Sequence, residues 1–387
     1  MPRTIHPWNR ARRAPSFDDL MEPTRDVLPH VPALEARGNR PLQMSFEEQL
    51  RTLVYFHLEE HTSGRHLMQV LEEDDFAREH IAPAAGIKRS SFCEAINSRG
   101  LEQLISLYGD LQAKASRLLP CEYKELGNLV SVDGSFIQAV LSMAWADYRD
   151  GSKKAKVHVG FDINRSIPTK IFLTDGKADE RPFVSKIVSP GQTAVMDRYY
   201  QCHKNFDLWQ QEGRHFVCRI RANTNKTCIE MHPVAPGGIV FYDATVLLGT
   251  PGVNQTEKPV RVVGYQIGTV CYWVATDRHD LSAEQIAMVY KLRWEVEKFF
   301  AWWKRHLRVY HLIARSEYGL MVQIMAGLIT YLLLALYCHK HHNEKVSISR
   351  VRELRIQIQN EIRASEPPDR ISHNFKEQGN VTLSAKT

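Results

Sequence analysis

One glutamate, Glu297, lies among cations and a phenol in the segment YKLRWEVEKFFAWWK, residues 290–304. If this segment is an α-helix, in which each residue advances about 100° around the axis, Tyr290, Arg293 and Lys304 share the face of the glutamate. That face can be a solvated surface with ion pairs, such as one between Arg293 and Glu297. It can also bind phosphate, because a guanidinium holds a phosphate through two parallel hydrogen bonds.

The opposite side of the same helix is apolar. Val296, Phe299 and Trp303 form a stripe suited to packing on a core, and the neighbouring carboxylate of Glu295 projects in a different direction from that of Glu297. The helical phase therefore singles out Glu297 as the one carboxylate on a polar face that is directed away from the core.

Two aspartates follow apolar runs that are typical of strands. The run LVSVD ends at Asp133, and the run QTAVMD ends at Asp197. An aspartate at the end of a strand often only forms a turn, so each residue taken alone has a structural interpretation. We expect both carboxylates at points where the chain leaves a sheet.

The elements that must position these aspartates alternate between strands and helices. We expect strands at residues 129–133, 155–163, 167–174, 192–197 and 215–220, with helices at residues 179–188 and 202–211. This order is that of the ribonuclease-H-like fold, in which the first and fourth strands are adjacent. Adjacency would place Asp133 beside Asp197, and two close carboxylates repel unless a cation lies between them. Oxygen ligands of this kind favour magnesium or manganese.

The spacing of the four polar residues in the glutamate helix, Y-(2)-R-(3)-E-(6)-K, resembles the signature of the DDE transposases of the insertion-sequence-4 family. The resemblance extends over roughly residues 45–345. It implies that Glu297 is the third metal-binding carboxylate, after Asp133 in VDGS and Asp197 in MDRYY. It also implies that Tyr290, Arg293 and Lys304 hold DNA phosphates.

The same resemblance implies a fold and further DNA contacts. The fold is an α/β protein with a ribonuclease-H-like catalytic core (residues 126–221 and 279–345), interrupted by an inserted β-rich domain (residues 222–278). Within that insertion Trp273 has the place of an aromatic residue that stacks on a flipped base, although a tryptophan in a strand is also a common core residue. Arg198, directly after Asp197, has the place of a phosphate-binding arginine.

The implied reaction is two-metal phosphoryl transfer. Two Mg²⁺ ions, for which Mn²⁺ would substitute, would be held by Asp133, Asp197 and Glu297. The element's terminal inverted repeats would be cleaved, and the 3′-hydroxyl ends would be joined to target DNA. Because two ends must be held together, a homodimer in a synaptic complex is expected. The alternatives are a ribonuclease-H-like nuclease or resolvase, and a sequence-specific DNA-binding protein with an inactive catalytic domain.

The two ends of the chain differ from the segments between them. Residues 1–43 are rich in proline and arginine and suggest a flexible basic arm. Residues 346–387 suggest a C-terminal helix and tail. Residues 44–125 have helical periodicity and suggest an N-terminal helical DNA-binding domain. In it KRSSFCEAINSRG looks like a helix-turn-helix element, with Lys88 and Arg89 available to phosphates.

Composition limits the class of protein. With 43% hydrophobic and 24% charged residues and a formal charge of +6, the 387-residue chain is typical of a soluble globular protein and is compatible with a polyanionic partner. Seven cysteines without a CxxC pair argue against a disulfide framework and a structural zinc site. With no apolar run after the first arginines, we expect a bacterial cytoplasmic, nucleoid-associated protein. Residues 318–338 lack charge, and we expect a buried helix there and no membrane partner.

Overall fold

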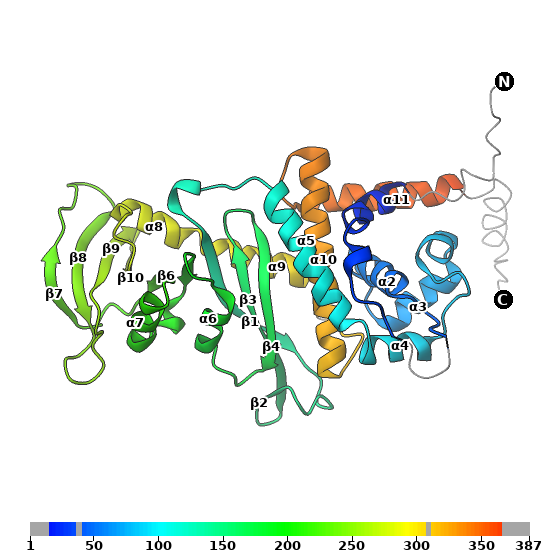
Figure 1. Ribbon diagram of the computed structural model, residues 1–387, viewed down its shortest axis with the longest axis horizontal. Coiled ribbons are helices and arrows are strands. Elements are labelled where there is room, and N and C mark those ends of the chain that lie inside the picture. Colours follow the sequence, from blue (N-terminus) through cyan, green and yellow to red (C-terminus); the bar gives the residue numbers. More distant parts are fainter. Residues whose placement is uncertain (1–14, 36–40, 307–310, 366–387) are drawn as a thin grey trace, which may run out of the picture.

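The computed structural model of the chain describes residues 15–35, 41–306 and 311–365 (Figure 1). A ten-stranded sheet occupies one half of the elongated molecule, and a group of packed helices occupies the other. The strands are β1 (Leu129–Gln138), β2 (Asp147–Arg149), β3 (Ser152–Asp162), β4 (Ile167–Asp175), β5 (Thr193–Met196), β6 (His215–Arg219), β7 (Lys226–Met231), β8 (Val240–Leu248), β9 (Val260–Ile267) and β10 (Val270–Thr276). The α-helices are α1 (Pro15–Met21), α2 (Phe46–Leu58), α3 (Gly64–Glu73), α4 (Arg89–Ser98), α5 (Leu101–Leu118), α6 (Val184–Ile187), α7 (His203–Gln211), α8 (Ala283–Lys291), α9 (Trp294–His306), α10 (Glu317–His342) and α11 (Ile348–Ser365).

The centre of the sheet has the expected neighbours. Its order is β2-β3-β1-β5-β6-β10-β9-β8-β7, and β4 pairs with β3. β1 is antiparallel to β3 and parallel to β5, and β5 is parallel to β6. The prediction that the first and fourth expected strands lie side by side is therefore confirmed. The prediction that the first strand ends at Asp133 is wrong, because β1 continues to pair with β3 as far as Gln138.

Residues 222–278 are rich in strands, but they do not form a sheet of their own. β10 pairs with β6, β9 with β10, β8 with β9 and β7 with β8. Residues 222–278 are therefore β-rich, as expected, and their strands extend the central sheet at one edge. The reason is the antiparallel register of β10 with β6, which directs the ladder hydrogen bonds of the insertion to the central strands.

The helical half of the molecule shares one apolar core with part of the sheet. The buried helix α10 packs against α2, α4 and α5, and side chains of these helices, such as Leu53 and Leu328, belong to the same cluster as Val157 and Phe161 of β3. Residues 44–125 are helical as expected, and Ser45 and Glu48 form a capping box at the start of α2. These helices are nevertheless not a unit with a core of their own.

α10 is the one helix, in the described part of the chain, that is long and apolar enough to cross a membrane. Within its most apolar stretch 94% of the residues are buried inside the protein. The expectation of a buried helix at residues 318–338 is thereby confirmed.

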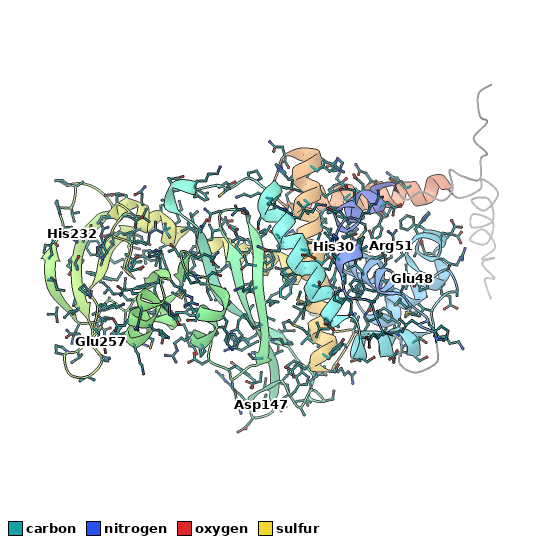
Figure 2. All side chains as sticks on the ribbon, viewed as in Figure 1. His30, Glu48, Arg51, Asp147, His232 and Glu257 are labelled. Carbon is teal, nitrogen blue, oxygen red and sulfur yellow. The ribbon has the colours of Figure 1, made fainter. Side chains whose placement is uncertain are left out.

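The N-terminal segment is ordered where the structure describes it, so the expected flexible arm over residues 1–43 is wrong for residues 15–30. Phe17 and Leu20 of α1 are completely buried in the helical core. Arg51 of α2, labelled in Figure 2, donates a hydrogen bond of 2.9 Å to Asp18, and its guanidinium lies 5.0 Å from the ring centroid of Phe17. Apolar burial and this ion pair fix the segment. The arginines at positions 10, 12 and 13 lie outside the described residues.

The expected single helix over residues 290–304 is wrong, because α8 ends at Lys291 and α9 begins at Trp294. Across the break the N–H of Arg293 donates to the carbonyl of Tyr290 at 3.2 Å, in a four-residue turn of 3₁₀ type. The two helices pack in different apolar clusters: Val289 of α8 with sheet residues such as Val263, and Val296 of α9 with Phe161 of β3. The turn lets each apolar face reach its own cluster.

Candidate active site

Asp133 and Asp197 reach the same part of the sheet through parallel pairing. Ser131 of β1 is paired with Val195 of β5, so two residues further along each strand the chain reaches Asp133 and Asp197. The Asp197 carboxylate accepts a hydrogen bond of 2.8 Å from the N–H of Tyr199 and caps the 3₁₀ turn Arg198–Tyr200. The charge of Asp197 also acts on Asp133, whose pKa it raises. The structure therefore brings this predicted pair together.

Arg293 connects Asp133 to Glu297. One guanidinium nitrogen, Nη2, lies 2.6 Å from Oε1 of Glu297, and the other, Nη1, lies 3.8 Å from Oδ2 of Asp133. The guanidinium is buried, whereas about a third of the Glu297 side chain is exposed. Among the described residues no group of three acidic, histidine or cysteine side chains already has a metal-holding arrangement. The carboxylate of Glu297 is thus linked to that of Asp133 through the guanidinium of Arg293.

Burial raises the pKa of Asp133 to about 7. The nearby guanidinium of Arg293 and the Gly134 N–H, which donates a 2.8 Å hydrogen bond, act in the opposite direction. The carboxylates of Asp197 and Glu180 act in the same direction as burial, and the value of about 7 is the net result. A charged Asp133 is therefore costly without an added cation. The donors are carboxylate oxygens, the ligands that hard divalent ions prefer, so the chemistry of the site fits such an ion.

The raised pKa of Asp133 predicts an unusual pH dependence of stability. The folded protein keeps this proton up to about pH 7, whereas the ordinary pKa is 3.8. Between these values the folded state binds more protons than the unfolded state, so stability falls as the pH rises through this window and stays lower above it. In EDTA at about pH 8, Asp133→Asn should raise the melting temperature by a few degrees. The gain should shrink at about pH 5, because Asp133 is then protonated in the folded wild type.

Thermal unfolding with and without a divalent ion measures this effect. Mn²⁺ should raise the melting temperature of the wild type, because an ion that binds only the folded state stabilises it, and should leave Asp133→Asn unchanged. A variant that melts below the wild type in EDTA at alkaline pH would contradict the prediction. It would mean that the ion pair with Arg293 stabilises the folded protein by more than the burial of the Asp133 charge destabilises it.

The two other polar residues of the glutamate helix also stay near this site, although the helix is broken. The ring of Tyr290 is buried, and the guanidinium of Arg293 lies 5.8 Å from its centroid. Burial lowers the pKa of Lys304, and the negative charge of Asp133 opposes that shift. Arg293 and Lys304 therefore lie near Asp133, and Tyr290 contacts Arg293.

The remaining predicted residues are Trp273, Arg198, Lys88 and Arg89. Trp273 of β10 contacts Phe241 and Tyr242, at 5.3 and 5.1 Å between ring centroids, and the ammonium of Lys226 lies 4.4 Å from its ring. Arg198 is exposed beside Asp197. Lys88 and Arg89 are exposed at the start of α4, in the helical half of the molecule and apart from β1 (Figure 1).

Glu180 was missed by the sequence reasoning. It lies in the loop after β4, and its charge acts on Asp133. No local pattern identifies a single acid in the loop sequence DGKADER. The one available signal is Gly134 directly after Asp133, since glycine in a strand often marks a close approach by another group.

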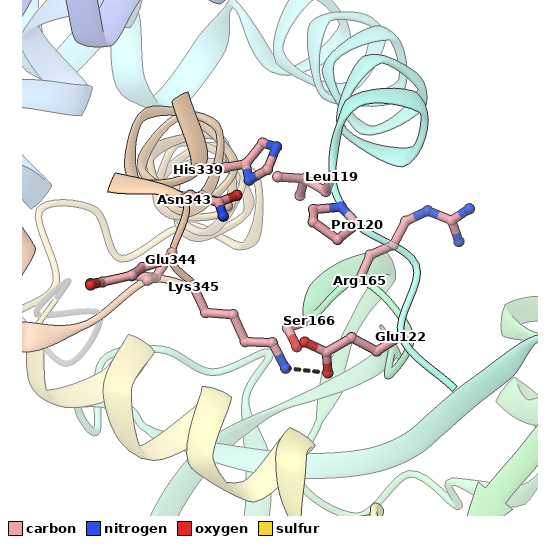
Figure 3. Close-up of a pocket in the computed structure, with 11 residues that line it drawn as sticks. Leu119, Pro120, Glu122, Arg165, Ser166, His339, Asn343, Glu344 and Lys345 are labelled. Carbon is pink, nitrogen blue, oxygen red and sulfur yellow. Dashed lines mark hydrogen bonds and ion pairs between the residues drawn. The ribbon is translucent and has the colours of Figure 1, made fainter. Parts of the chain in front are cut away.

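A pocket elsewhere in the molecule contains none of the predicted site residues. It lies between the end of α5, the turn after β3 and the end of α10, and an ion pair of 2.8 Å between Lys345 and Glu122 lies at one side of it (Figure 3). His339 and Arg165 also line it. The candidate chemistry is thus at the carboxylates on the sheet.

Comparison with known proteins shows the family of the chain. Residues 125–333, more than half of the chain, match the family model described as "Transposase DDE domain". The chain is 29% identical over 215 residues to a protein of Geobacillus stearothermophilus named as a probable transposase for insertion sequence element IS5377, a match that covers 54% of this chain and 56% of the relative. It is 23% identical over 256 residues to a Synechocystis protein named for insertion sequence element IS4SA, covering 64% of this chain and 71% of that relative.

The chain spans about half the length of the Geobacillus relative. The matched residues 125–333 include β1 to β10 and α6 to α9. They therefore include Asp133, Asp197 and Glu297 together with the elements that position them. On the extent of this match, the chain belongs to the transposase DDE domain family.

Proposed function

We propose that this protein is a DNA transposase that binds the ends of an insertion sequence, cleaves them and joins the 3′-hydroxyl ends to target DNA. The observation that carries the proposal is the position of Asp133 on β1 beside Asp197, which directly follows the adjacent parallel strand β5, with Glu297 linked to Asp133 by Arg293. The names of the relatives, transposases for insertion sequence elements, support it.

The mixed α/β structure with a central sheet and flanking helices fits a DDE transposase fold. We propose that β1, β3, β4, β5 and β6 are a ribonuclease-H-like core. Three antiparallel strands followed by two parallel ones support this proposal. In this interpretation α8 and α9 complete the core, and the N-terminal helices of residues 44–125 contact DNA.

Asp133, Asp197 and Glu297 would hold two Mg²⁺ ions, for which Mn²⁺ would substitute. When bound, such ions activate the attacking water or hydroxyl and stabilise the leaving oxygen. The protein's own part is to present the carboxylates. Glu297 must exchange its contact with Arg293 for the metal, and the freed guanidinium is then available to a DNA phosphate.

The cations around the carboxylates support phosphate binding there. Arg293 and Lys304 lie near Asp133, Tyr290 contacts Arg293, and Arg198 is exposed beside Asp197. Phosphate contacts position DNA without reading its sequence. We assign further phosphate contacts to Lys88 and Arg89 at the start of α4, and base stacking to Trp273. Since two ends must be held at once, we propose a homodimer on DNA, acting in the bacterial cytoplasm on the nucleoid.

The test is an assay of cleavage and joining. The full-length protein is incubated with Mg²⁺ and a labelled DNA fragment that bears the inverted repeats found on either side of the gene, together with a plasmid target. A transposase releases the ends and joins them to the plasmid. Cleavage without joined product would favour the nuclease or resolvase, and binding without cleavage would favour the DNA-binding protein with an inactive catalytic domain.

A further inference from the structure

Glu180 approaches β1 beside Asp133 at a place that only glycine leaves open. A Cβ added to Gly134 would lie 2.5 Å from the carboxyl carbon of Glu180, which is closer than real Cβ contacts. The glycine after Asp133 therefore makes room for a second carboxylate from the loop after β4. The side chain of Glu180 is mostly buried, with 15% of its surface exposed.

Two buried groups hold the Glu180 carboxylate in this position. The phenol of Tyr200 donates a hydrogen bond of 2.8 Å to Oε2, and the ammonium of Lys156 lies 3.3 Å from Oε1. Tyr200 follows Asp197 in the chain, and Lys156 of β3 is paired with Phe136 of β1. Glu180 is thus fixed by groups that are attached to the two segments that carry the aspartates.

The surroundings of Tyr200 show that three carboxylates share this space. Burial raises the pKa of the Tyr200 phenol, and the charges of Glu180, Asp133 and Asp197 raise it further. The phenol therefore stays protonated and remains a hydrogen-bond donor to Glu180. This arrangement resembles the hydrogen-bonded outer groups that orient the ligands of metal sites.

We propose that Glu180 is a positioning residue for the divalent metal site of Asp133 and Asp197, acting from outside the coordination sphere. The inference rests on the proposed function. Each oxygen of Glu180 already has its own partner, Tyr200 or Lys156, so the carboxylate acts through Asp133 and not as a direct ligand. Its negative charge favours cation binding at the aspartates, and its contact with Gly134 fixes the part of β1 from which Asp133 projects.

Mn²⁺ binding to the full chain, measured by electron paramagnetic resonance in the absence of DNA, tests this proposal. Glu180→Gln should weaken Mn²⁺ binding by about 10- to 100-fold, the usual cost of removing an outer partner of a metal ligand. Tyr200→Phe should act in the same direction by a smaller factor, because Lys156 still holds the carboxylate. Glu295→Gln, the matched change at an ion-paired carboxylate on α9, should bind Mn²⁺ as the wild type does.

A second variant separates metal binding from folding. Glu180→Gln leaves the buried ammonium of Lys156 without its carboxylate, which destabilises a fold. The double variant Glu180→Gln with Lys156→Met removes that unpaired charge. Its melting temperature in EDTA should recover, while Mn²⁺ binding should stay weak.

The outcomes distinguish this inference from the proposed function. If Mn²⁺ binding is lost in Asp133→Asn but is normal in the Glu180 double variant, Glu180 serves only as the partner of Lys156 and the inference is wrong. If Asp133→Asn itself binds Mn²⁺ like the wild type, the metal site is elsewhere and the proposed function loses its basis.

Discussion

Asp197→Asn is expected to abolish both cleavage and joining while leaving the binding of DNA ends intact. The amide keeps the shape of the side chain but removes the charge that attracts a divalent ion. Its carbonyl oxygen can still accept the 2.8 Å hydrogen bond from the N–H of Tyr199, so the turn Arg198–Tyr200 should persist. Because metal ions contribute several kcal/mol of transition-state stabilisation, the rate should fall by at least about 10³-fold.

The same assay of end cleavage and joining measures this loss, with a gel-shift experiment for end binding. Asp133→Asn should behave in the same way, since its charge belongs to the same pair. Asp147→Asn is the matched control, because Asp147 is paired with Lys153 and Lys177 near the sheet edge at β2, away from this pair. Normal cleavage by Asp197→Asn, or an equal loss of cleavage in Asp147→Asn, would contradict the assignment of the site.

The sequence was sufficient to predict the neighbouring positions of Asp133 and Asp197, because the patterns that indicate them lie within short segments of the chain. An apolar run followed by a carboxylate marks Asp133 and Asp197, and the order of strands and helices predicts that β1 and β5 are neighbours. The same holds for the buried stripe of α9, where Val296 and Trp303 are completely buried. The carboxylates at the ends of apolar runs and the stripe of α9 depend on residues close together in the chain, and the neighbouring strands follow from the order of the elements.

The predictions that failed depend on distant partners. The break between α8 and α9 follows from the packing of the two helices in different apolar clusters, which no periodicity within residues 290–304 shows. The pairing of β10 with β6, which continues the central sheet into residues 222–278, likewise depends on a distant partner. Glu180 has its partners Tyr200 and Lys156 on other segments, so its place beside Asp133 becomes visible only in the fold.

The second large effect is expected from two glutamates that differ by two positions on α9. Glu297 contacts the buried Arg293, which also faces Asp133, whereas Glu295 is paired with the exposed Lys298 at 2.7 Å. Glu297→Gln should reduce cleavage by about 10³-fold or more, because the third metal-binding charge is lost. Glu295→Gln should stay within about twofold of the wild type, because exposed ion pairs contribute little.

Because Glu297 contacts Arg293, this pair of variants also tests whether Arg293 must leave Glu297 before DNA binds. An amide binds a guanidinium more weakly than a carboxylate does, so Glu297→Gln should also release Arg293. If Arg293 then holds a DNA phosphate, Glu297→Gln should bind ends at least as tightly as the wild type while failing to cleave them. Equal loss of cleavage in both variants would mean that the two faces of α9 are wrongly assigned. Weaker end binding by Glu297→Gln would mean that the ion pair with Arg293 organises the DNA surface, and that Arg293 does not have to leave Glu297 before DNA can bind.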